Sequence, residues 1–245
     1  MKKIIFTLFF ISSLFGWVGE ITALKGGAVI IRDNNTTNAF VHMKLEEKDI
    51  IKTQQNSKMQ IIFKDNTIIT IGKNSEVKVS DYLFDGENSQ AKFKLKYGIM
   101  KTLTGKIGKL APKRFKVMTK NASIGIRGTY FVVESYKDII KLGMIKGVTE
   151  FTNLDNMKNY VVKAGEQLIF NVDNPKDVII KDGYLEPKTT KIKPLSKTIK
   201  EVQDEVDDTE NDAVTENKDV TTTQNSKSTG IYDGFFRGLI DKFFK

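Results

Sequence analysis

Residue types that could do chemistry are scarce in this chain. Among its 245 residues it has one His and no Cys, which excludes disulfides, thiol nucleophiles, thiolate metal sites and most Ser–His or multi-His schemes. His42 lies between Val41 and Met43, a setting typical of a packed or half-exposed strand residue. Glu46 and Glu47 are adjacent, so on a strand they would face opposite sides. We therefore predict no enzyme, no metal ion, no cofactor and no small-molecule ligand.

One Gly-rich stretch could hold an anion. Residues 104–109 contain two Gly and two Lys, and further cations follow at 113 and 114. Backbone N–H groups in such a loop can cradle a phosphate, with Lys106, Lys109 and Arg114 as candidate anion or partner contacts. The spacing is not that of a nucleotide-binding P-loop. A solvated connection between strands explains the same residues and is the favoured interpretation.

Arg127 is the other candidate anion or partner contact. It lies within Gly-Ile-Arg-Gly-Thr at 125–129, and a guanidinium offers a planar fork of donors to a carboxylate or phosphate. Glycines in a strand more often mark a bulge or tight entry, with the Arg satisfying backbone carbonyls or one carboxylate. We favour this second interpretation of Arg127.

The charge is unevenly distributed. Lys and Arg number 39 against 30 Asp and Glu, a net charge of +9, yet residues 196–245 carry 7 basic and 11 acidic side chains. The preceding residues are therefore strongly basic. A basic body is typical of proteins with anionic surroundings, although it is also a common bias of composition.

The N-terminus predicts export. Residues 1–3 are Met-Lys-Lys, and residues 4–16 are mostly apolar but too few to cross a membrane comfortably. We interpret residues 1–18 as a secretory signal peptide, with an uncleaved anchor as the alternative. The predicted location is the periplasm, with the cell surface or secretion as alternatives, and export disfavours a nucleic acid as the partner.

Residues 19–182 predict an all-β domain. In residues 92–97 aromatic residues and Leu alternate with three Lys, so Phe93, Leu95 and Tyr97 are expected on one strand face. Residues 58–71 predict a hairpin around Asp65-Asn66. Further strands are expected at 27–32, 76–84, 115–119, 128–134, 138–146, 159–163 and 167–172. Short connections favour a jelly-roll-like antiparallel β-sandwich or roll.

The C-terminal part has a different composition. Residues 183–229 predict a disordered linker with nine acids against one Lys at 201–219, and with a transient helix at 199–206. Residues 230–245 predict an amphipathic helix. We interpret its stripe as a tethered module that binds an envelope protein or a membrane surface, with packing back onto the β domain as the alternative. The candidate docking residues are Phe235, Phe236, Leu239, Ile240, Phe243 and Phe244.

Over residues 19–134 the sequence resembles the FecR-domain family. The similar blocks, in order, are 19–32, 45–53, 57–63, 65–67, 71–75, 115–119 and 122–131, the last with the Gly-Ile-Arg-Gly-Thr ending. Asn66 stands where the family commonly has Gly, a turn substitution that Asn tolerates, and residues 120–121 replace a common Pro. The resemblance implies a jelly-roll-like β domain in the periplasm. The family's regulators place a cytoplasmic helical segment and a transmembrane helix before this domain, and neither is expected here.

We therefore predict an exported, non-enzymatic binding or scaffold protein of the cell envelope, acting in envelope signalling or partner recognition. The alternative is a structural component of surface adhesion or assembly.

Overall fold

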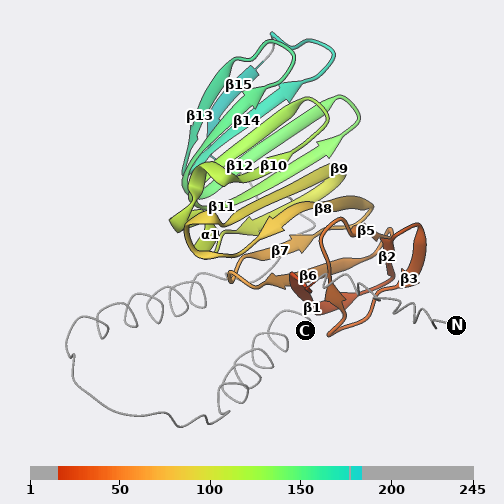
Figure 1. The fold of residues 1–245 in the computed structure, drawn as a ribbon. Coiled ribbons are helices and arrows are strands. Elements are labelled where there is room, and N and C mark those ends of the chain that lie inside the picture. The colour runs from red at the N-terminus through yellow and green to blue at the C-terminus, as the bar shows by residue number, and fades with distance from the viewer. Residues whose placement is uncertain (1–15, 177, 184–245) are drawn as a thin grey trace, which may run out of the picture. The chain divides into compact units, whose positions relative to one another are not determined.

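The computed structural model describes residues 16–176 and 178–183, and Figure 1 shows their arrangement. Most of these residues are in β-strands, and few are in helices. The strands are β1 Gly19–Lys25, β2 Ala28–Arg32, β3 Asn35–Asn38, β4 Lys44–Leu45, β5 Ile50–Thr53, β6 Lys58–Phe63, β7 Ile68–Ile71, β8 Ser75–Leu83, β9 Gln90–Leu103, β10 Phe115–Met118, β11 Ala122–Tyr136, β12 Ile139–Asn153, β13 Asn159–Lys163, β14 Glu166–Asn171 and β15 Val178–Asp182. The helices are η1 Gly86–Asn88, α1 Lys106–Leu110 and η2 Pro112–Arg114.

All fifteen strands belong to one hydrogen-bonded sheet. Its pairs are antiparallel except for β9 and β10, which run parallel, so the sheet is mixed. The all-β prediction is confirmed. The finer prediction of a purely antiparallel, jelly-roll-like arrangement is not confirmed, because the network is one open mixed sheet.

The sheet has two halves, and three long strands, β9, β11 and β12, run through both of them. Residues 90–97 of β9 pair with β8 and β10, whereas its later residues pair with β7 and β11. The first half consists of β4, β1, β6, β7, the end of β9, the end of β11, the start of β12, β14 and β15. The second half consists of β3, β2, β5, β8, the start of β9, β10, the start of β11, the end of β12 and β13.

Gly98 is the point where β9 passes from one half to the other. Its φ of +105° lies outside the range that L side chains adopt readily. A Cβ atom at this position would lie 2.1 Å from Ser75 Oγ and 2.5 Å from Ser75 Cα. The bend therefore depends on the absence of a side chain.

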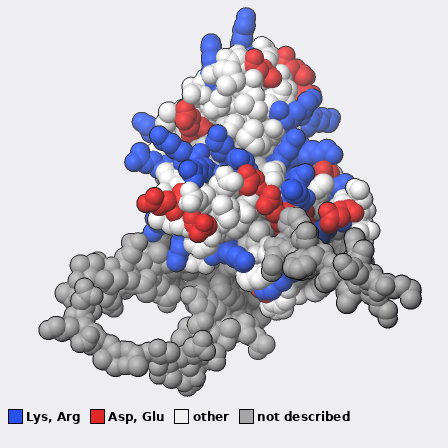
Figure 2. All heavy atoms as spheres, viewed as in Figure 1, with Lys and Arg blue, Asp and Glu red and all other residues white. Residues whose placement is uncertain are grey.

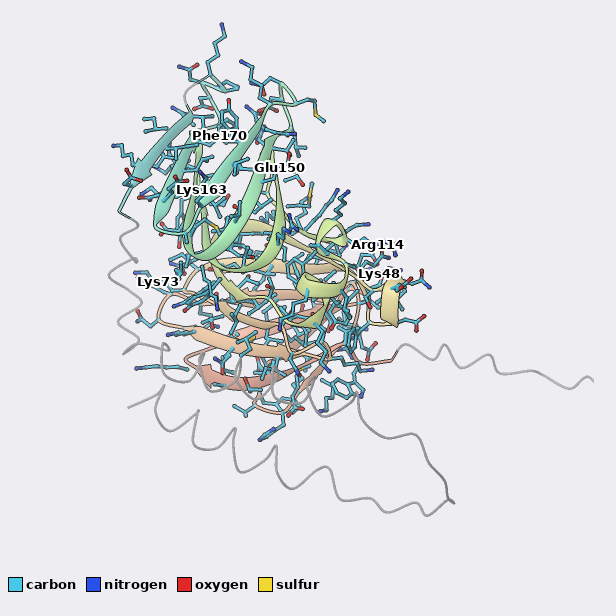
Figure 3. All side chains as sticks on the ribbon, turned by 90° about the vertical axis from the view of Figure 1, so that its left-hand side faces the viewer. Lys48, Lys73, Arg114, Glu150, Lys163 and Phe170 are labelled. Atoms are coloured by element: carbon cyan, nitrogen blue, oxygen red, sulfur yellow. The ribbon has the colours of Figure 1, made fainter. Side chains whose placement is uncertain are left out.

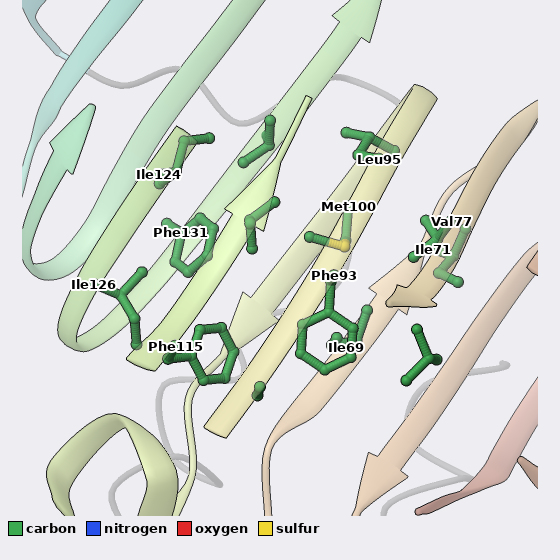
Figure 4. Close-up of a cluster of buried hydrophobic side chains, with 14 of the residues drawn as sticks. Ile69, Ile71, Val77, Phe93, Leu95, Met100, Phe115, Ile124, Ile126 and Phe131 are labelled. Atoms are coloured by element: carbon green, nitrogen blue, oxygen red, sulfur yellow. The ribbon is translucent and has the colours of Figure 1, made fainter. Parts of the chain in front are cut away.

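The hydrophobic core lies between the two halves, and Figure 4 shows part of it. Phe63 of the first half contacts Phe93 of the second, with ring centroids 4.9 Å apart. Phe151 of the second half contacts Phe170 of the first at 5.6 Å. Because these ring contacts join the halves, the continuous sheet folds over on itself around one core.

The strand predictions were largely right in position and too short in extent. The predicted face of residues 93, 95 and 97 is correct for Phe93 and Leu95, which are fully buried, but wrong for Tyr97, which is 39% exposed. The pairing with β8 shifts between Glu76 and Val77, directly opposite this part of β9, and the backbone bends at the next residue. This bulge turns Tyr97 out of the core.

His42 is also placed differently from the prediction. It lies in a turn with φ +73°, and its side chain is 71% exposed. Its Nδ1 is 2.7 Å from Glu20 Oε1, and Lys44 Nζ also bonds the Glu20 carboxylate. Partial burial alone would raise the pKa of Glu20, but Lys44 and His42 outweigh burial and hold the pKa below its ordinary value.

Candidate functional site

The loop before α1 uses its own backbone donors inside the chain. The N–H of Gly105 donates to Thr67 Oγ1 at 2.9 Å, and the N–H of Lys106 donates to the Asp65 carbonyl oxygen at 2.7 Å. The N–H of Ile107 donates to Asp65 Oδ2 at 3.1 Å. An external anion would therefore be held here by side chains, because these three N–H groups already have acceptors.

The acceptor that fills this loop is the fully buried side chain of Asp65, in the turn between β6 and β7. Besides Ile107, its carboxylate accepts hydrogen bonds from the Tyr82 hydroxyl at 2.8 Å, the Thr67 N–H at 3.1 Å and the Thr67 hydroxyl at 2.7 Å. Burial, together with the negative charge of Asp65, raises the pKa of Tyr82 far above its ordinary value. The cluster joins the turn, the α1 loop and the second half of the sheet.

The four predicted cationic contacts lie on neighbouring elements. Lys106 and Lys109 are exposed on α1, and Arg114 ends η2, where its Nη1 donates to the Glu87 carbonyl oxygen at 3.2 Å. Both α1 and η2 pack against β11, which carries Arg127. The fold thus brings together cations that are up to 21 positions apart in sequence.

Figure 3 shows Arg114 beside the short helical turns, well away from Lys163 on β13 and Glu150 on β12. Arg127 is nearer to these strands, because it stands opposite Val148 of β12, and Val148 in turn stands opposite Lys163 of β13.

Arg127 marks an irregular point of β11. It pairs with Val148, after which the register shifts before Tyr130, as expected for a bulge. Its side chain is exposed and has no hydrogen-bond or ion-pair partner within residues 16–176 and 178–183. Arg32 is a contrast, because it bonds both oxygens of buried Asp49, at 2.8 and 2.7 Å. The guanidinium of Arg127 is thus available to a partner.

A second basic surface, which the sequence analysis did not identify, lies on the outer side of the second half. We call it the lysine face, and it consists of Lys78, Lys92, Lys94, Lys96 and Lys116. Lys94 stands opposite Lys78 on β8, and Lys92 stands opposite Lys116 on β10. Like charges directly opposite each other destabilise a sheet. The alternation of residues 92–97 indicated that three of these lysines share one strand face. That they pair across the sheet with Lys78 and Lys116 depends on strand register, which the sequence pattern does not give.

Only part of this charge is compensated. Glu76 forms ion pairs with Lys96 at 3.1 Å and with Lys52 at 3.3 Å, and Asp81 pairs with Lys92 at 3.0 Å. Lys and Arg side chains gather across the middle of the molecular face shown in Figure 2. The domain therefore presents cations at the α1 end and on a sheet face.

Across the described ranges, no three His, Asp or Glu side chains are grouped so that they could hold a metal ion. Within the same part of the chain, the helices are too short to cross a membrane. The predicted docking residues Phe235, Phe236, Leu239, Ile240, Phe243 and Phe244 lie outside the described residues.

The comparison with protein families identifies the domain. Residues 49–150 match the family described as FecR protein. This range includes the hairpin β6–β7, the bent strand β9, the α1 loop and the Gly-Ile-Arg-Gly-Thr bend of β11. The chain therefore carries a FecR domain, which confirms the resemblance seen in the sequence.

Solved structures and curated proteins add little to this identification. Two crystal structures of a candidate anti-sigma factor from Parabacteroides distasonis are similar, each with 14% sequence identity and a TM-score of 0.48. Each match covers 63% of this chain, and 73% or 72% of the other. No curated protein matches the sequence.

Proposed function

We propose that this chain is an exported, non-enzymatic protein of the cell envelope that acts in signalling or partner recognition through its FecR domain. The observation that carries the proposal is the FecR match over residues 49–150. The domain also exposes cationic side chains on α1, on η2 and on its sheet strands. Such an arrangement suits recognition of an anionic surface better than bond-making chemistry.

In this proposal the partner contacts Arg127, Lys106, Lys109 and Arg114 at the α1 end of the sheet. These side chains are exposed, and the backbone beneath them is held by the buried Asp65 cluster. A rigid base reduces the entropy lost when side chains bind a partner. We expect acidic groups on the partner to face this end.

A second contact in the proposal comes from the amphipathic helix predicted for residues 230–245. It would bring the FecR domain to a membrane surface or to an apolar groove of an envelope protein. The aromatic stripe supplies apolar area, and Lys242 and Lys245 add a salt-sensitive attraction to anionic lipid.

The proposal also places the cleavage of the leader, at least two residues before the boundary predicted after residue 18. Val18 is buried in the core, and its N–H donates to the Leu45 carbonyl oxygen at 2.7 Å. The Val18 carbonyl oxygen accepts a hydrogen bond from the backbone N–H of Lys64 at 3.0 Å. The Trp17 ring lies under the ammonium groups of Lys44 and Lys64, at 4.3 and 4.5 Å. Cleavage before Trp17 would keep these contacts in the exported chain, so N-terminal sequencing should begin no later than Trp17.

Cross-linking in intact cells tests the partner contact. We compare the chain with a variant that carries Glu at positions 106, 109, 114 and 127, and with a control that carries Glu at the exposed positions Lys120, Lys137 and Lys158. The proposal predicts a specific envelope partner that is lost in the first variant and kept in the control. Equal capture by both variants would exclude the α1 end as the contact.

Vesicle co-sedimentation tests the contact through residues 230–245. Phe236→Ser with Phe243→Ser is compared with Phe40→Ser and Phe84→Ser, which remove two exposed aromatic residues of the β-sheet domain. On vesicles of phosphatidylglycerol and phosphatidylethanolamine, the first pair should release the chain and the second should not. If neither pair changes sedimentation, the terminal helix is not the membrane contact.

A further inference from the structure

Five cationic side chains form a diagonal line across the outer side of the second half of the sheet. Lys94 of β9 stands opposite Lys78 of β8. Lys116 of β10 lies on the diagonal from Lys94, and Arg127 of β11 lies on the next diagonal from Lys116. Lys163 of β13 continues the line from Arg127 across β12. We call these five residues the cation track.

The five side chains share one side of the sheet because their neighbours along each strand belong to the core. Side chains alternate along a strand, so the track residues point to the outer side. Neighbouring strands lie about 4.8 Å apart and alternate residues about 6.7 Å apart along a strand, so each diagonal step is about 8 Å. One buried neighbour from each strand, in order from β8 to β11 and then β13, is Val77, Phe93, Val117, Ile126 and Val162.

The track differs from the cations beside it because its charge is not compensated. Lys92 and Lys96 flank the track on β9, but Lys92 pairs with Asp81 at 3.0 Å and Lys96 pairs with Glu76 at 3.1 Å. In the part of the chain that the structure describes, the side chains of the track residues have neither a hydrogen-bond nor an ion-pair partner. Four of them are exposed, and Lys78 is half-buried. Their charge is thus available to an external anion.

Gly125 of β11 leaves an open place beside the track. It stands between Lys116 on one neighbouring strand and Glu150 on the other. Its φ is not positive, and a Cβ atom added there would meet only the Glu150 carbonyl oxygen, at 3.9 Å, an ordinary contact. Packing therefore does not require this glycine, in contrast to Gly98. The missing side chain leaves the surface low between Lys116 and Arg127, and a glycine in a strand often marks a place where a ligand approaches the backbone.

We propose that the cation track binds a linear anionic polysaccharide. The track crosses six strands, about 25 Å, and is one residue wide, so it suits a long partner that carries charge along its length. Four of its five cations are Lys, a point charge on a flexible stem, which fits many spaced anionic groups better than one bidentate group. Sugar rings also have flat carbon–hydrogen faces, which would lie over Gly125 and over Val148, whose side chain is exposed between Arg127 and Lys163.

Other linear polyanions fit this surface less well. Recognition of a peptide by a sheet uses an open edge, an apolar groove or a cluster of Arg. The strands under the track are paired on both sides except β13, and the track contains a single Arg. Single-stranded nucleic acids are held by stacking on aromatic side chains, and the track has none.

The glycan site does not rest on the proposed function. Arg127 also belongs to the contact proposed for the α1 end, whereas the other four track residues do not. Variants that change only those four lysines therefore leave the proposed partner contact intact. Loss of glycan binding and loss of the envelope cross-link are separate results.

Calorimetric titration of the full chain with polygalacturonate and dextran sulfate tests the track, with neutral dextran as the blank. The test variant carries Gln at positions 78, 94, 116 and 163, and the control carries Gln at four exposed lysines outside the track, Lys25, Lys73, Lys120 and Lys137. Each exposed ion pair contributes about twofold to fivefold, so the test variant should bind at least about tenfold more weakly and the control nearly as well as the unsubstituted chain. Equal weakening in both variants, or no binding of either glycan, would overturn the proposal.

Two single substitutions test the path of the chain across the sheet. Gly125→Leu should fill the open place and weaken glycan binding at least about threefold without lowering the melting temperature, because the added side chain has room. Glu150→Gln removes an exposed acid beside the track and should strengthen binding. Unchanged affinity in both variants would contradict the proposed path.

Competing polyanions identify the class of partner. Polyglutamate, single-stranded DNA and vesicles rich in phosphatidylglycerol are titrated against the unsubstituted chain and the four-lysine variant at the same salt concentration. The proposal predicts that the two glycans bind most tightly and show the largest loss in the variant. A larger loss for polyglutamate, DNA or vesicles would assign the track to that partner and overturn the glycan site.

Discussion

Replacing the buried carboxylate of Asp65 should destabilise the FecR domain out of proportion to the small change in shape. Asp65→Asn keeps the volume but turns one carboxylate oxygen into an NH2 group. In one orientation this group would face the N–H of Ile107 and the hydroxyl of Thr67, which now donate to Oδ2. In the other it would face the Tyr82 hydroxyl and the Thr67 N–H. Either way, two donors lose their acceptor.

The size of the effect follows from burial. Leaving a buried donor without an acceptor costs about 1–3 kcal/mol, and two donors lose theirs here. Local rearrangement recovers part of this cost, so we expect the free energy of unfolding to fall by about 2–4 kcal/mol. Tyr82→Phe removes one donor to Asp65 and the acceptor of the Asp65 N–H, and should cost about 1–3 kcal/mol.

Urea unfolding of the full chain, followed by circular dichroism, measures both changes, and the double variant gives the coupling energy. We expect the two substitutions together to cost at least about 0.5 kcal/mol less than the sum of the single costs. Asp33→Asn, at an exposed turn, is the matched control and should stay within about 0.5 kcal/mol of the unsubstituted chain. If Asp65→Asn is as harmless as this control, the carboxylate does not hold the loop as described.

The raised pKa of Tyr82 adds a dependence on alkaline pH. The folded state favours the protonated phenol, so its contribution is fully present below the unfolded pKa of about 10 and is lost as pH rises through the folded pKa. The free energy of unfolding should therefore decline above about pH 10. Tyr82→Phe should make this decline shallower in urea titrations between about pH 9 and pH 11. Parallel curves for the two chains would contradict the assignment.

Three further predictions concern the sheet. Leu95→Ala should lower the free energy of unfolding by about 2–5 kcal/mol because Leu95 is fully buried, while the neighbouring Lys94→Ala should change it by less than about 0.5 kcal/mol in the same denaturation assay. Gly98→Ala should cost roughly 3 kcal/mol or more, because the new Cβ meets Ser75 and the φ is positive, and an unchanged melting temperature would show that the bend relaxes freely. Burial alone would raise the pKa of Glu76, but its two lysine partners leave it lowered, so its stabilisation is present above the unfolded pKa and lost as pH falls through the folded pKa. Glu76→Gln should therefore reduce the loss of stability below about pH 4.5, as acid titrations of both chains would show.

The lysine face and the bend of β9 contain features that the sequence pattern could not predict. The alternation of residues 92–97 predicted a strand with lysines on one side, and that is correct through Leu95. It could not predict that Tyr97 leaves the core, because the cause is a register shift against β8. The pairing of Lys94 with Lys78 across the two strands could not be predicted for the same reason, because strand register is set by residues far away in sequence.

The α1 loop is a second example. Its glycines and lysines indicated an anion cradle or a solvated connection, and both interpretations treated the loop by itself. The structure instead fills it with Asp65, about 40 residues earlier in the chain. Local patterns carry no information about such a partner, because the hairpin and the loop meet only when the sheet folds over on itself.

The sequence by itself determined the all-β class, the hairpin at 58–71, the scarcity of catalytic residue types and the FecR resemblance, because each depends on local period, composition or ordered motifs. Only the tertiary structure decided which residues act together. Strand register placed like charges opposite one another on the lysine face, positive φ at Gly98 carried β9 from one half of the sheet to the other, and burial turned Asp65 and Tyr82 into a connected cluster. These features depend on contacts between distant residues, which periodicity along one chain does not encode.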